Sequence, residues 1–355
     1  MTIAFYAPLK APNHPVPSGD RSVARALLAA LRHAGQDTVV ASDLRLYDGT
    51  GDAELQARLA VDASAEVRRL CALPEAQRWT HWLTYHNYYK APDLIGPQVS
   101  EALNIPYLQV ESTRAKKRLT GAWAGFAAAA EAASDAAHTI FYFTRHDAET
   151  LRRDAPAGQV LTHLPPFLDR VDLPASSDLS GPLLTVAMMR PGDKLASYTL
   201  IADALRLLPD DLDWHLDIAG DGSARQDVMH LMAPFGARVS FLGQLDAEAL
   251  AAHYAHASAF LWPGVNEAFG MVYLEAQGAG VPVIAQNRPG VRDVVAGALP
   301  STGDGAKALA EKIVALACNP ALAREASRDA REKIATSHLL PHAARILGTA
   351  IEAST

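Results

Sequence analysis

The sequence contains few cysteines and no long apolar run. Its two cysteines, Cys71 and Cys318, lie far apart without neighbouring metal ligands, which argues against a disulfide framework and suits a reducing cytoplasm. No stretch of about 18 uncharged apolar residues occurs, so we expect no membrane-spanning helix. The amino-terminal segment MTIAFYAPLK has no charged leader or cleavage site and predicts a first strand rather than a signal peptide. These absences together predict a cytoplasmic protein.

An excess of basic residues is also missing. The 32 lysines and arginines are outnumbered by 39 aspartates and glutamates, which gives a net charge of −7. Because a general nucleic-acid-binding protein presents a basic face, this balance argues against such a function. It leaves room for a local basic pocket that binds a small anion. Nearly half of the residues are hydrophobic and a fifth are charged, as in ordinary globular enzymes and binding proteins.

The pattern of apolar segments predicts two α/β domains in tandem. A chain of 355 residues is too long for one ordinary core and suits two domains of roughly 150 to 200 residues. Short apolar strands alternate with helical stretches from TIAFYA at residues 2–7 to QVLTHLP at residues 159–165. The alternation restarts with LLTVAMM at residues 183–189 and continues to VPVIAQ at residues 281–286. Such alternation is typical of doubly wound parallel sheets with helices on both faces.

A proline-rich stretch separates the two halves. Residues 165–182 hold four prolines among serines and aspartates, a composition that resists both helix and strand. We therefore predict a first domain over residues 1–168, a linker over 169–182 and a second domain over 183–338. Residues 339–355 predict a final helix whose domain the pattern does not assign, with a crossing back to the first domain as one alternative.

Two cations follow the first strand of the second domain. In open parallel sheets, ligands bind beyond the carboxyl ends of the strands, where loops lead into helix N-termini. Arg190 and Lys194 flank a Pro-Gly turn in that position, so both can point into one loop mouth. An arginine fork with a lysine charge suits a phosphate or diphosphate, although two solvated surface cations are the simpler alternative.

A glycine-rich turn follows the next strand, in Ala219-Gly-Asp-Gly-Ser223. Its glycines would let a ligand or a neighbouring backbone come close. The turn partly matches the dinucleotide-binding pattern G-x-G-x-x-G, but Arg225 stands where the third glycine belongs. This departure weakens an assignment as an NAD-dependent dehydrogenase, and a plain strand-to-helix turn remains an alternative.

Two glutamates lie eight residues apart in NEAFGMVYLEAQGAG, residues 266–280. Glu267 lies in a loop, and Glu275 lies more than one turn into a helix expected to begin near Phe269 or Gly270. Eight helical residues span about 12 Å, so the carboxylates cannot share one proton-transfer point. They could instead hold two parts of an extended ligand by accepting hydrogen bonds from a hexose and a ribose diol. The alternative is a dipole-stabilising Glu267 and a solvated Glu275, but the surrounding helix is too apolar for an exposed face.

The segment E-A-F-G-x-x-x-L-E-A-x-x-x-G-x-P-V-I-A resembles the retaining GT-B glycosyltransferases of family 4, which use nucleotide-diphosphate sugars. The resemblance spans the second domain and includes FLGQL at residues 241–245 and PGVRDVV at residues 289–295. It implies a fold of two tandem Rossmann-like domains facing a cleft, with the donor on the second domain and the acceptor on the first.

The resemblance also implies roles for individual residues. Arg190 and Lys194 would hold the donor diphosphate, and Glu267 would bind hydroxyls of the donor sugar, which makes these three the implied catalytic residues. Glu275 would bind the ribose of the nucleoside. The other implied donor-binding residues are Gly19, Gly220, Phe269, Gly270 and Met271.

The first domain resembles the family more loosely. Gly19 is the single glycine that matches the family's phosphate-approaching loop, and Asp20 after it predicts the N-cap of a helix. His86 matches a histidine often found in this domain, although a structural role is the simpler alternative. Glu111 stands at or near another family histidine, close to the reacting sugar. An acceptor-binding or acid/base role for Glu111 and a shifted alignment both remain open.

The segment RAKKRLTGAWAGF, residues 114–126, places basic residues before Trp123 and Phe126. Several relatives dock on membranes through a basic, aromatic patch of the first domain. Because the chain is acidic overall, we interpret this segment as the solvated start of a helix around residues 115–135. A peripheral membrane contact is therefore not the favoured interpretation.

The sequence as a whole predicts a retaining glycosyltransferase that moves a sugar from a nucleotide-diphosphate sugar to an unidentified acceptor. Cations and helix N–H groups would stabilise the leaving diphosphate. No Asp-x-Asp motif stands at a strand end, so we expect neither a metal ion nor another cofactor. The alternatives are a sugar-nucleotide epimerase or phosphorylase of the same architecture, and a catalytically silent nucleotide-sugar-binding homologue.

Overall fold

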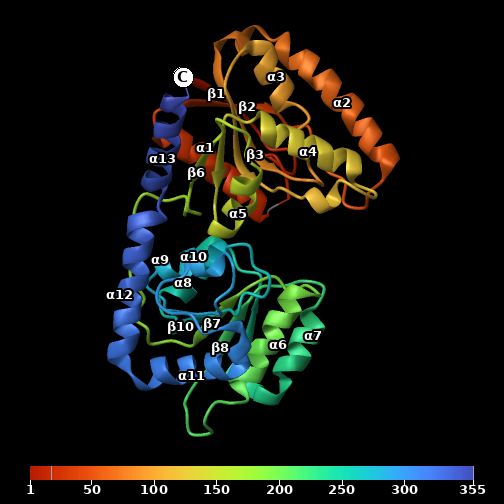
Figure 1. Cartoon of the computed structure of the whole chain (residues 1–355). Coiled ribbons are helices and arrows are strands. Elements are labelled where there is room, and N and C mark those ends of the chain that lie inside the picture. The colour runs from red at the N-terminus through yellow and green to blue at the C-terminus, as the bar shows by residue number, and fades with distance from the viewer. Residues whose placement is uncertain (17, 355) are drawn as a thin grey trace. The chain divides into compact units, whose positions relative to one another are not determined.

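The computed structural model describes residues 1–16 and 18–354, and their contacts divide the chain into two units (Figure 1). The first unit comprises Met1–Asp169 and the segment from Leu340 onward, and the second comprises Arg170–Leu339. Each unit is built on a parallel sheet with helices between successive strands. The expected α/β class with two Rossmann-like domains is therefore confirmed.

The strands of the first sheet lie in the order β2-β1-β3-β4-β5-β6 and pair in parallel. The order reverses between β1 and β3, and open α/β sheets bind ligands at such a switch point. The strands are β1 (Thr2–Tyr6), β2 (Asp37–Ser42), β3 (Trp79–Asn87), β4 (Tyr107–Ser112), β5 (Thr139–Tyr142) and β6 (Val160–His163). The helices are α1 (Gly19–His33), α2 (Ala53–Cys71), α3 (Gly96–Leu103), α4 (Ala124–Ala136), α5 (Arg145–Asp154) and α13 (Leu340–Ala353), with 3-10 turns at Pro74–Arg78 and Lys116–Arg118.

The second sheet has the order β11-β10-β7-β8-β9 and is also parallel. Its strands are β7 (Leu183–Val186), β8 (Leu216–Ala219), β9 (Val239–Gly243), β10 (Ala259–Leu261) and β11 (Val283–Ile284). Its helices are α6 (Asp193–Leu205), α7 (Arg225–Met232), α8 (Ala247–Tyr254), α9 (Met271–Gly278), α10 (Val291–Val294), α11 (Gly305–Cys318) and α12 (Pro320–Ser337), with 3-10 turns at Ala233–Arg238 and Thr302–Asp304.

The boundaries of the units lie after Asp169 and Leu339, one residue beyond the ends expected for the two domains. The segment expected as a linker packs on the second unit: the Ser177 and Gly181 N–H groups donate to the carbonyls of Ala279 and His256, both at 2.7 Å. The final helix, α13, returns to the first unit and lies beside α1 (Figure 1).

Local capping sets the start of α1, and the expected N-cap is wrong. The Ser18 hydroxyl accepts from the Arg21 N–H at 3.2 Å, so Ser18 caps the helix and Asp20 lies in its first turn. This leaves the Asp20 carboxylate available for another partner. The side chains that cap α2 and α5 are Asp52 and Thr144.

The basic segment 114–126 does not begin the long helix expected over residues 115–135. A 3-10 turn covers Lys116–Arg118, and α4 starts only at Ala124. Between them, Gly121 has a φ of 82°, a left-handed conformation that an α-helix does not contain. The cations of this segment therefore lie on a loop after β4.

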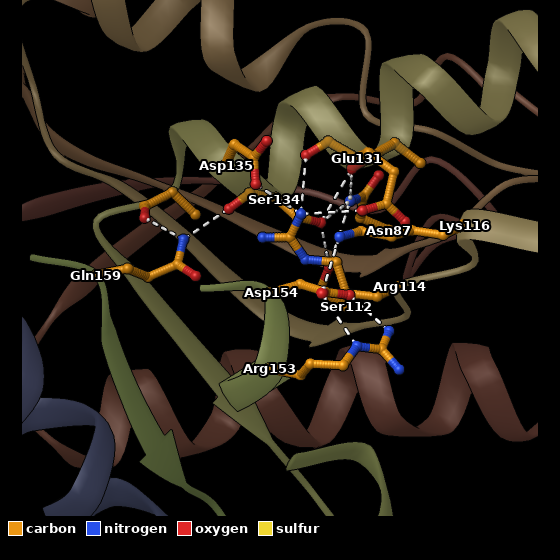
Figure 2. A network of polar contacts seen from close by, with 12 residues as sticks. Asn87, Ser112, Arg114, Lys116, Glu131, Ser134, Asp135, Arg153, Asp154 and Gln159 are labelled. Atoms are coloured by element: carbon orange, nitrogen blue, oxygen red, sulfur yellow. Dashed lines mark hydrogen bonds and ion pairs between the residues drawn. The ribbon is translucent and has the colours of Figure 1, made fainter. Parts of the chain in front are cut away.

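A polar network ties the carboxyl ends of β3 and β4 to α4 (Figure 2). Asn87, the last residue of β3, donates from Nδ2 to the Ala130 carbonyl at 2.9 Å and to Ser134 Oγ at 3.0 Å. Ser112, the last residue of β4, lies with its Oγ 2.6 Å from the same Ser134 oxygen. These bonds fix the points from which the loops after β3 and β4 leave the sheet.

Arg114 extends this network just beyond β4 (Figure 2). Its Nη1 donates to Asp135 Oδ1 at 2.6 Å and to Glu131 Oε2 at 3.0 Å, while its side chain is only 2% exposed. The other oxygen of Glu131 accepts from the Ala115 N–H at 2.8 Å. Because a buried charge is costly without its partner, these ion pairs hold the start of the basic segment against α4.

We expect Arg114→Leu to lower the free energy of unfolding by about 3 kcal/mol, because it leaves the Glu131 carboxylate partly buried without its cation. Lys117→Leu, at an exposed cation of the same segment, should change that free energy by less than about 0.5 kcal/mol. Urea denaturation followed by circular dichroism measures both. Equal midpoints for the two variants would contradict the role of this ion pair.

Candidate functional site

Two neighbouring strands of the second unit bring together cations and carboxylates at their carboxyl ends. β7 leads into the loop with Arg190 and then into α6, whose first turn contains Lys194. β10, which pairs with β7, leads into the loop with Glu267. Lys194 Nζ lies 2.5 Å from Glu267 Oε2, and the two side chains are 27% and 17% exposed. Arg190 is exposed.

Trp262 completes this cluster, although the sequence did not single it out. Its Nε1–H donates to Glu267 Oε2 at 3.2 Å, and Lys194 Nζ lies 5.2 Å from the centre of its ring. The Lys194–Glu267–Trp262 cluster is therefore an ion pair held against an aromatic face. The only signal in the sequence was that Trp262 stands at the end of an apolar strand. This position does not show which loop the indole ring faces.

The loop after β10 is held by contacts with the first turn of α6 and with the PGVRDVV segment. Asn266 has a φ of 50° and donates from Nδ2 to Asp193 Oδ2 at 2.9 Å. A Cβ on Gly290 would lie 1.6 Å from the Ala268 carbonyl oxygen, so the PGVRDVV segment packs directly against this loop. Glycine at position 290 thus allows the PGVRDVV segment to approach the loop after β10 closely.

α9 begins at Met271, next to the expected start at Phe269 or Gly270. Gly270, with a φ of 70°, is its N-cap and supplies no side-chain cap. Gly192 is likewise the N-cap of α6, with a φ of 80° and no side-chain cap. Uncapped N–H groups at helix starts favour anions. Both helix starts adjoin the Lys194–Glu267–Trp262 cluster in the sequence.

Glu275 lies on α9 in a half-buried position rather than on a solvated face. The Tyr254 hydroxyl donates to Glu275 Oε2 at 3.4 Å. Burial raises the pKa of this carboxyl, and Tyr254 and Arg170 oppose that shift. Tyr254, at the end of α8, is a second residue that sequence reasoning did not find. The partly desolvated carboxylate is suited to accept hydrogen bonds from hydroxyl groups.

The Gly220 turn has a structural explanation in the close approach of two loops. Gly220 and Gly222 have φ values of 141° and 153°. A Cβ on Gly220 would lie 2.0 Å from the carbonyl oxygen of Ala187, and a Cβ on Gly222 would lie 2.2 Å from that of Met189. The glycines therefore let the loops after β7 and β8 meet backbone to backbone. The contact of Gly220 with a donor stays a prediction.

The candidate residues of the first unit lie at the same kind of edge. Gly19 opens α1, where a Cβ would meet no atom within 4 Å. His86 and Glu111 lie at the ends of β3 and β4 with φ values of 67° and 58°. Such left-handed conformations are strained for residues other than glycine, and they concentrate at functional sites.

His86 and Glu111 belong to one group of titratable side chains. His86 Nδ1 lies 3.0 Å from Asp20 Oδ1, the carboxylate that does not cap α1. Burial opposes protonation of His86, but the carboxylates of Glu111 and Asp20 outweigh it and raise the pKa of the imidazole. Burial raises the pKa of Glu111, while His86 opposes the shift. The group can therefore bind and orient hydroxyls or hold a proton.

The described residues contain neither a cluster of metal ligands nor a membrane-spanning helix. Among the described residues, no three or more His, Cys, Asp or Glu side chains are placed to hold a metal ion. None of the helices within residues 1–16 and 18–354 has both the length and the apolar character needed to cross a membrane.

Comparison with known proteins connects this geometry to a family. Residues 182–319, most of the second unit, match the family described as glycosyl transferases group 1. A GDP-mannose-dependent alpha-mannosyltransferase of Mycolicibacterium smegmatis is 40% identical over 84 residues, which are 24% of this chain and 21% of the relative. A D-inositol 3-phosphate glycosyltransferase of Geodermatophilus obscurus is 28% identical over 320 residues, 80% of this chain and 69% of the relative. The chain thus aligns with only a fifth of the first relative and about two thirds of the second.

The fold agrees with solved structures along the whole chain. Sucrose-phosphate synthase from Thermosynechococcus elongatus is similar with a TM-score of 0.72 at 20% identity, over 99% of this chain and 98% of the synthase. Because the identity is only 20%, this likeness is evidence for the fold alone. Residues 182–319 therefore match the group 1 glycosyl transferases, and the two parallel-sheet units have the GT-B fold.

Proposed function

We propose that this protein transfers a sugar from a nucleotide-diphosphate sugar to an acceptor, with retention at the anomeric carbon and without a metal ion. The Lys194–Glu267–Trp262 cluster at the carboxyl edge of the second sheet is the observation that carries the proposal. Retention rests on the resemblance of the E-A-F-G segment to family 4. Sugar-nucleotide use is supported by the group 1 match over residues 182–319.

The charges of the cluster suit a diphosphate. Lys194 is neutralised by Glu267 in the structure, and an incoming diphosphate would offer it a stronger partner. Arg190, exposed on the preceding loop, would add a second cation, and the uncapped starts of α6 and α9 would add N–H donors. The backbone N–H groups of the helix starts are fixed before the reaction, so they stabilise charge on the leaving group without reorganisation.

The carboxylates would hold the sugar and the ribose. Both observed contacts of the Glu267 carboxylate use Oε2, so we assign Oε1 to a hydroxyl of the donor sugar. Glu275 would accept hydrogen bonds from the ribose diol. The Tyr254 hydroxyl, which donates to Glu275 Oε2, would orient the carboxylate. In the transfer, the acceptor oxygen bonds to the anomeric carbon as the bond to the diphosphate breaks. The acceptor proton passes to the departing phosphate oxygen.

A thermal-shift panel with UDP, GDP, ADP, CMP and NAD tests the donor site. One nucleoside diphosphate at 100 times its dissociation constant should raise the melting temperature by roughly 5 to 10 °C. Glu275→Ala should lose this shift because the ribose hydroxyls lose their acceptor, whereas Glu248→Ala, at an exposed carboxylate of the same unit, should keep it. A shift with NAD alone, or with none of the five, contradicts the proposal.

Lys194→Met should lower the turnover of the donor by about 10²- to 10³-fold, by analogy with the loss of one preorganised donor to a developing anion. Release of nucleoside diphosphate at saturating donor, with water or a screened sugar as acceptor, measures this rate. Lys307→Met, at an exposed lysine of the second unit, is the matched control and should retain the wild-type rate. A full-rate Lys194→Met enzyme would remove Lys194 from the mechanism.

Treatment with EDTA should leave the rate unchanged, because side-chain cations and helix N–H groups take the place of a metal. The same nucleotide-release assay, run after dialysis against EDTA and again with added Mg²⁺ or Mn²⁺, measures this. A rate lost on dialysis and restored by either ion would show that the leaving diphosphate needs a metal.

A further inference from the structure

Two cations lie over the same two aromatic rings in the first unit. Lys90 Nζ is 5.9 Å from the centre of the Tyr89 ring and 5.3 Å from that of Trp123. Arg118 Cζ is 5.1 and 5.6 Å from the same two centres. The rings meet edge to face with their centres 5.8 Å apart. We call Tyr89, Lys90, Arg118 and Trp123 the cation–aromatic cluster.

The cluster is assembled from loops at the carboxyl edge of the first sheet. Tyr89 and Lys90 follow β3, while Arg118 and Trp123 follow β4, and these two strands are parallel neighbours. Asp48 joins the two loops: its N–H donates to the Lys90 carbonyl at 2.9 Å, and its own carbonyl accepts from Trp123 Nε1 at 3.3 Å. The cluster is therefore held in place by long-range bonds.

Among the described residues, the carboxylate of Asp48 forms no ion pair with Lys90 or Arg118. It already accepts hydrogen bonds from the Thr50 and Gly51 N–H groups and from Gln56 Nε2, at 2.8, 2.9 and 2.7 Å. These bonds keep the pKa of Asp48 low although its burial acts in the opposite direction. Its role is to shape the loop that carries the contacts to Lys90 and Trp123.

Among the residues that the structure describes, the cations of the cluster have no acidic partner. Their neighbours do: Arg114 pairs with Glu131 and Asp135, and Lys116 Nζ lies 2.8 Å from Asp154 Oδ1. Within residues 1–16 and 18–354, no ion pair includes Lys90 or Arg118, and Arg118 Nε is shielded from solvent without a hydrogen-bond partner. A buried donor without a partner costs about 1 to 3 kcal/mol, and two like charges on one ring pair repel.

A row of rings leads from the cluster to His86. Tyr88 and Tyr89 meet edge to face with their centres 5.6 Å apart, and Tyr88 stacks on the His86 ring at 4.7 Å. His86 in turn contacts Asp20 and lies near Glu111. A half-exposed row of rings thus separates two cations from a group of hydrogen-bonding side chains, which suits a ligand with an anionic end and a hydroxylated end.

We propose that Lys90 and Arg118, held over Tyr89 and Trp123, bind an oxyanion, a phosphate or carboxylate group, that belongs to a polyhydroxylated acceptor. His86 and Glu111 bind the hydroxyls at the other end of the same molecule. The identification of the bound molecule as the acceptor rests on the proposed function. The oxyanion site itself rests on the geometry of the first unit.

Binding of glucose 6-phosphate tests the site, with uncharged glucose as the comparison ligand. Tryptophan fluorescence at constant ionic strength reports binding because Trp123 lies in the cluster. Glucose 6-phosphate should give a saturable change and glucose none. Lys90→Gln and Arg118→Gln should each weaken binding about tenfold or more, the loss expected for one charge-assisted hydrogen bond. Lys90→Arg should retain most of the affinity.

Lys117→Gln is the matched control, because Lys117 is exposed on the same loop and outside the cluster. It should bind glucose 6-phosphate as the wild type does. An equal loss of affinity for glucose 6-phosphate in Lys117→Gln and Lys90→Gln would show that only the net positive charge of the loop matters. This result would overturn the proposal. Cation-dependent binding to vesicles of phosphatidylcholine and phosphatidylglycerol, without binding of glucose 6-phosphate, would overturn it in favour of a lipid surface.

The nucleotide thermal shift separates this proposal from the proposed function. Lys90→Gln and Arg118→Gln should keep the wild-type shift, which also shows that they fold. If no nucleoside diphosphate shifts any variant but glucose 6-phosphate binds as described, the glycosyltransferase proposal fails and the oxyanion site stands. If the shift is present and glucose 6-phosphate does not bind the wild type, the oxyanion site is wrong.

Discussion

Parallel pairing of strands is the constraint on which both candidate sites depend. In a parallel sheet every strand ends at the same edge, so loops that are far apart in the sequence leave the sheet side by side. In the second unit this brings Lys194, after β7, within 2.5 Å of Glu267, after β10. In the first unit it brings Lys90 and Arg118 to one pair of rings. Neither pair is adjacent along the chain.

Burial then decides what the gathered side chains can do. Glu267 pairs with the Lys194 ammonium and accepts a hydrogen bond from the Trp262 indole N–H in a partly buried place. Glu275 and Glu111 are desolvated with weaker support, which raises the pKa of each carboxyl. Lys90 and Arg118 share rings and lack a counter-ion in the described chain, which leaves them suited to an incoming anion. The same rule, that a buried charge needs a partner, connects these sites.

Much of the fold was predictable from the sequence because its signals are local. Apolar runs and the spacing between them predicted the parallel sheets of both units. The E-A-F-G segment predicted the neighbourhood of Glu267 and the start of α9. Local signals also misled. Asp20 predicted a helix cap, but Ser18 takes that position and Asp20 pairs with His86. The segment after Glu111 predicted a helix start, but the left-handed Gly121 interrupts it.

Local patterns in the sequence specify the class of fold, the strand ends and the residues that stand there, since periodicity and turn composition act over a few residues. Which of these residues meet is set by the packing of each unit. Lys194 on Glu267, Asp20 on His86 and the sharing of Trp123 between two cations all join segments whose spacing carries no local signal. The physical reason is that side-chain contacts across a sheet edge follow from strand order, and strand order is set by the packing of the whole unit.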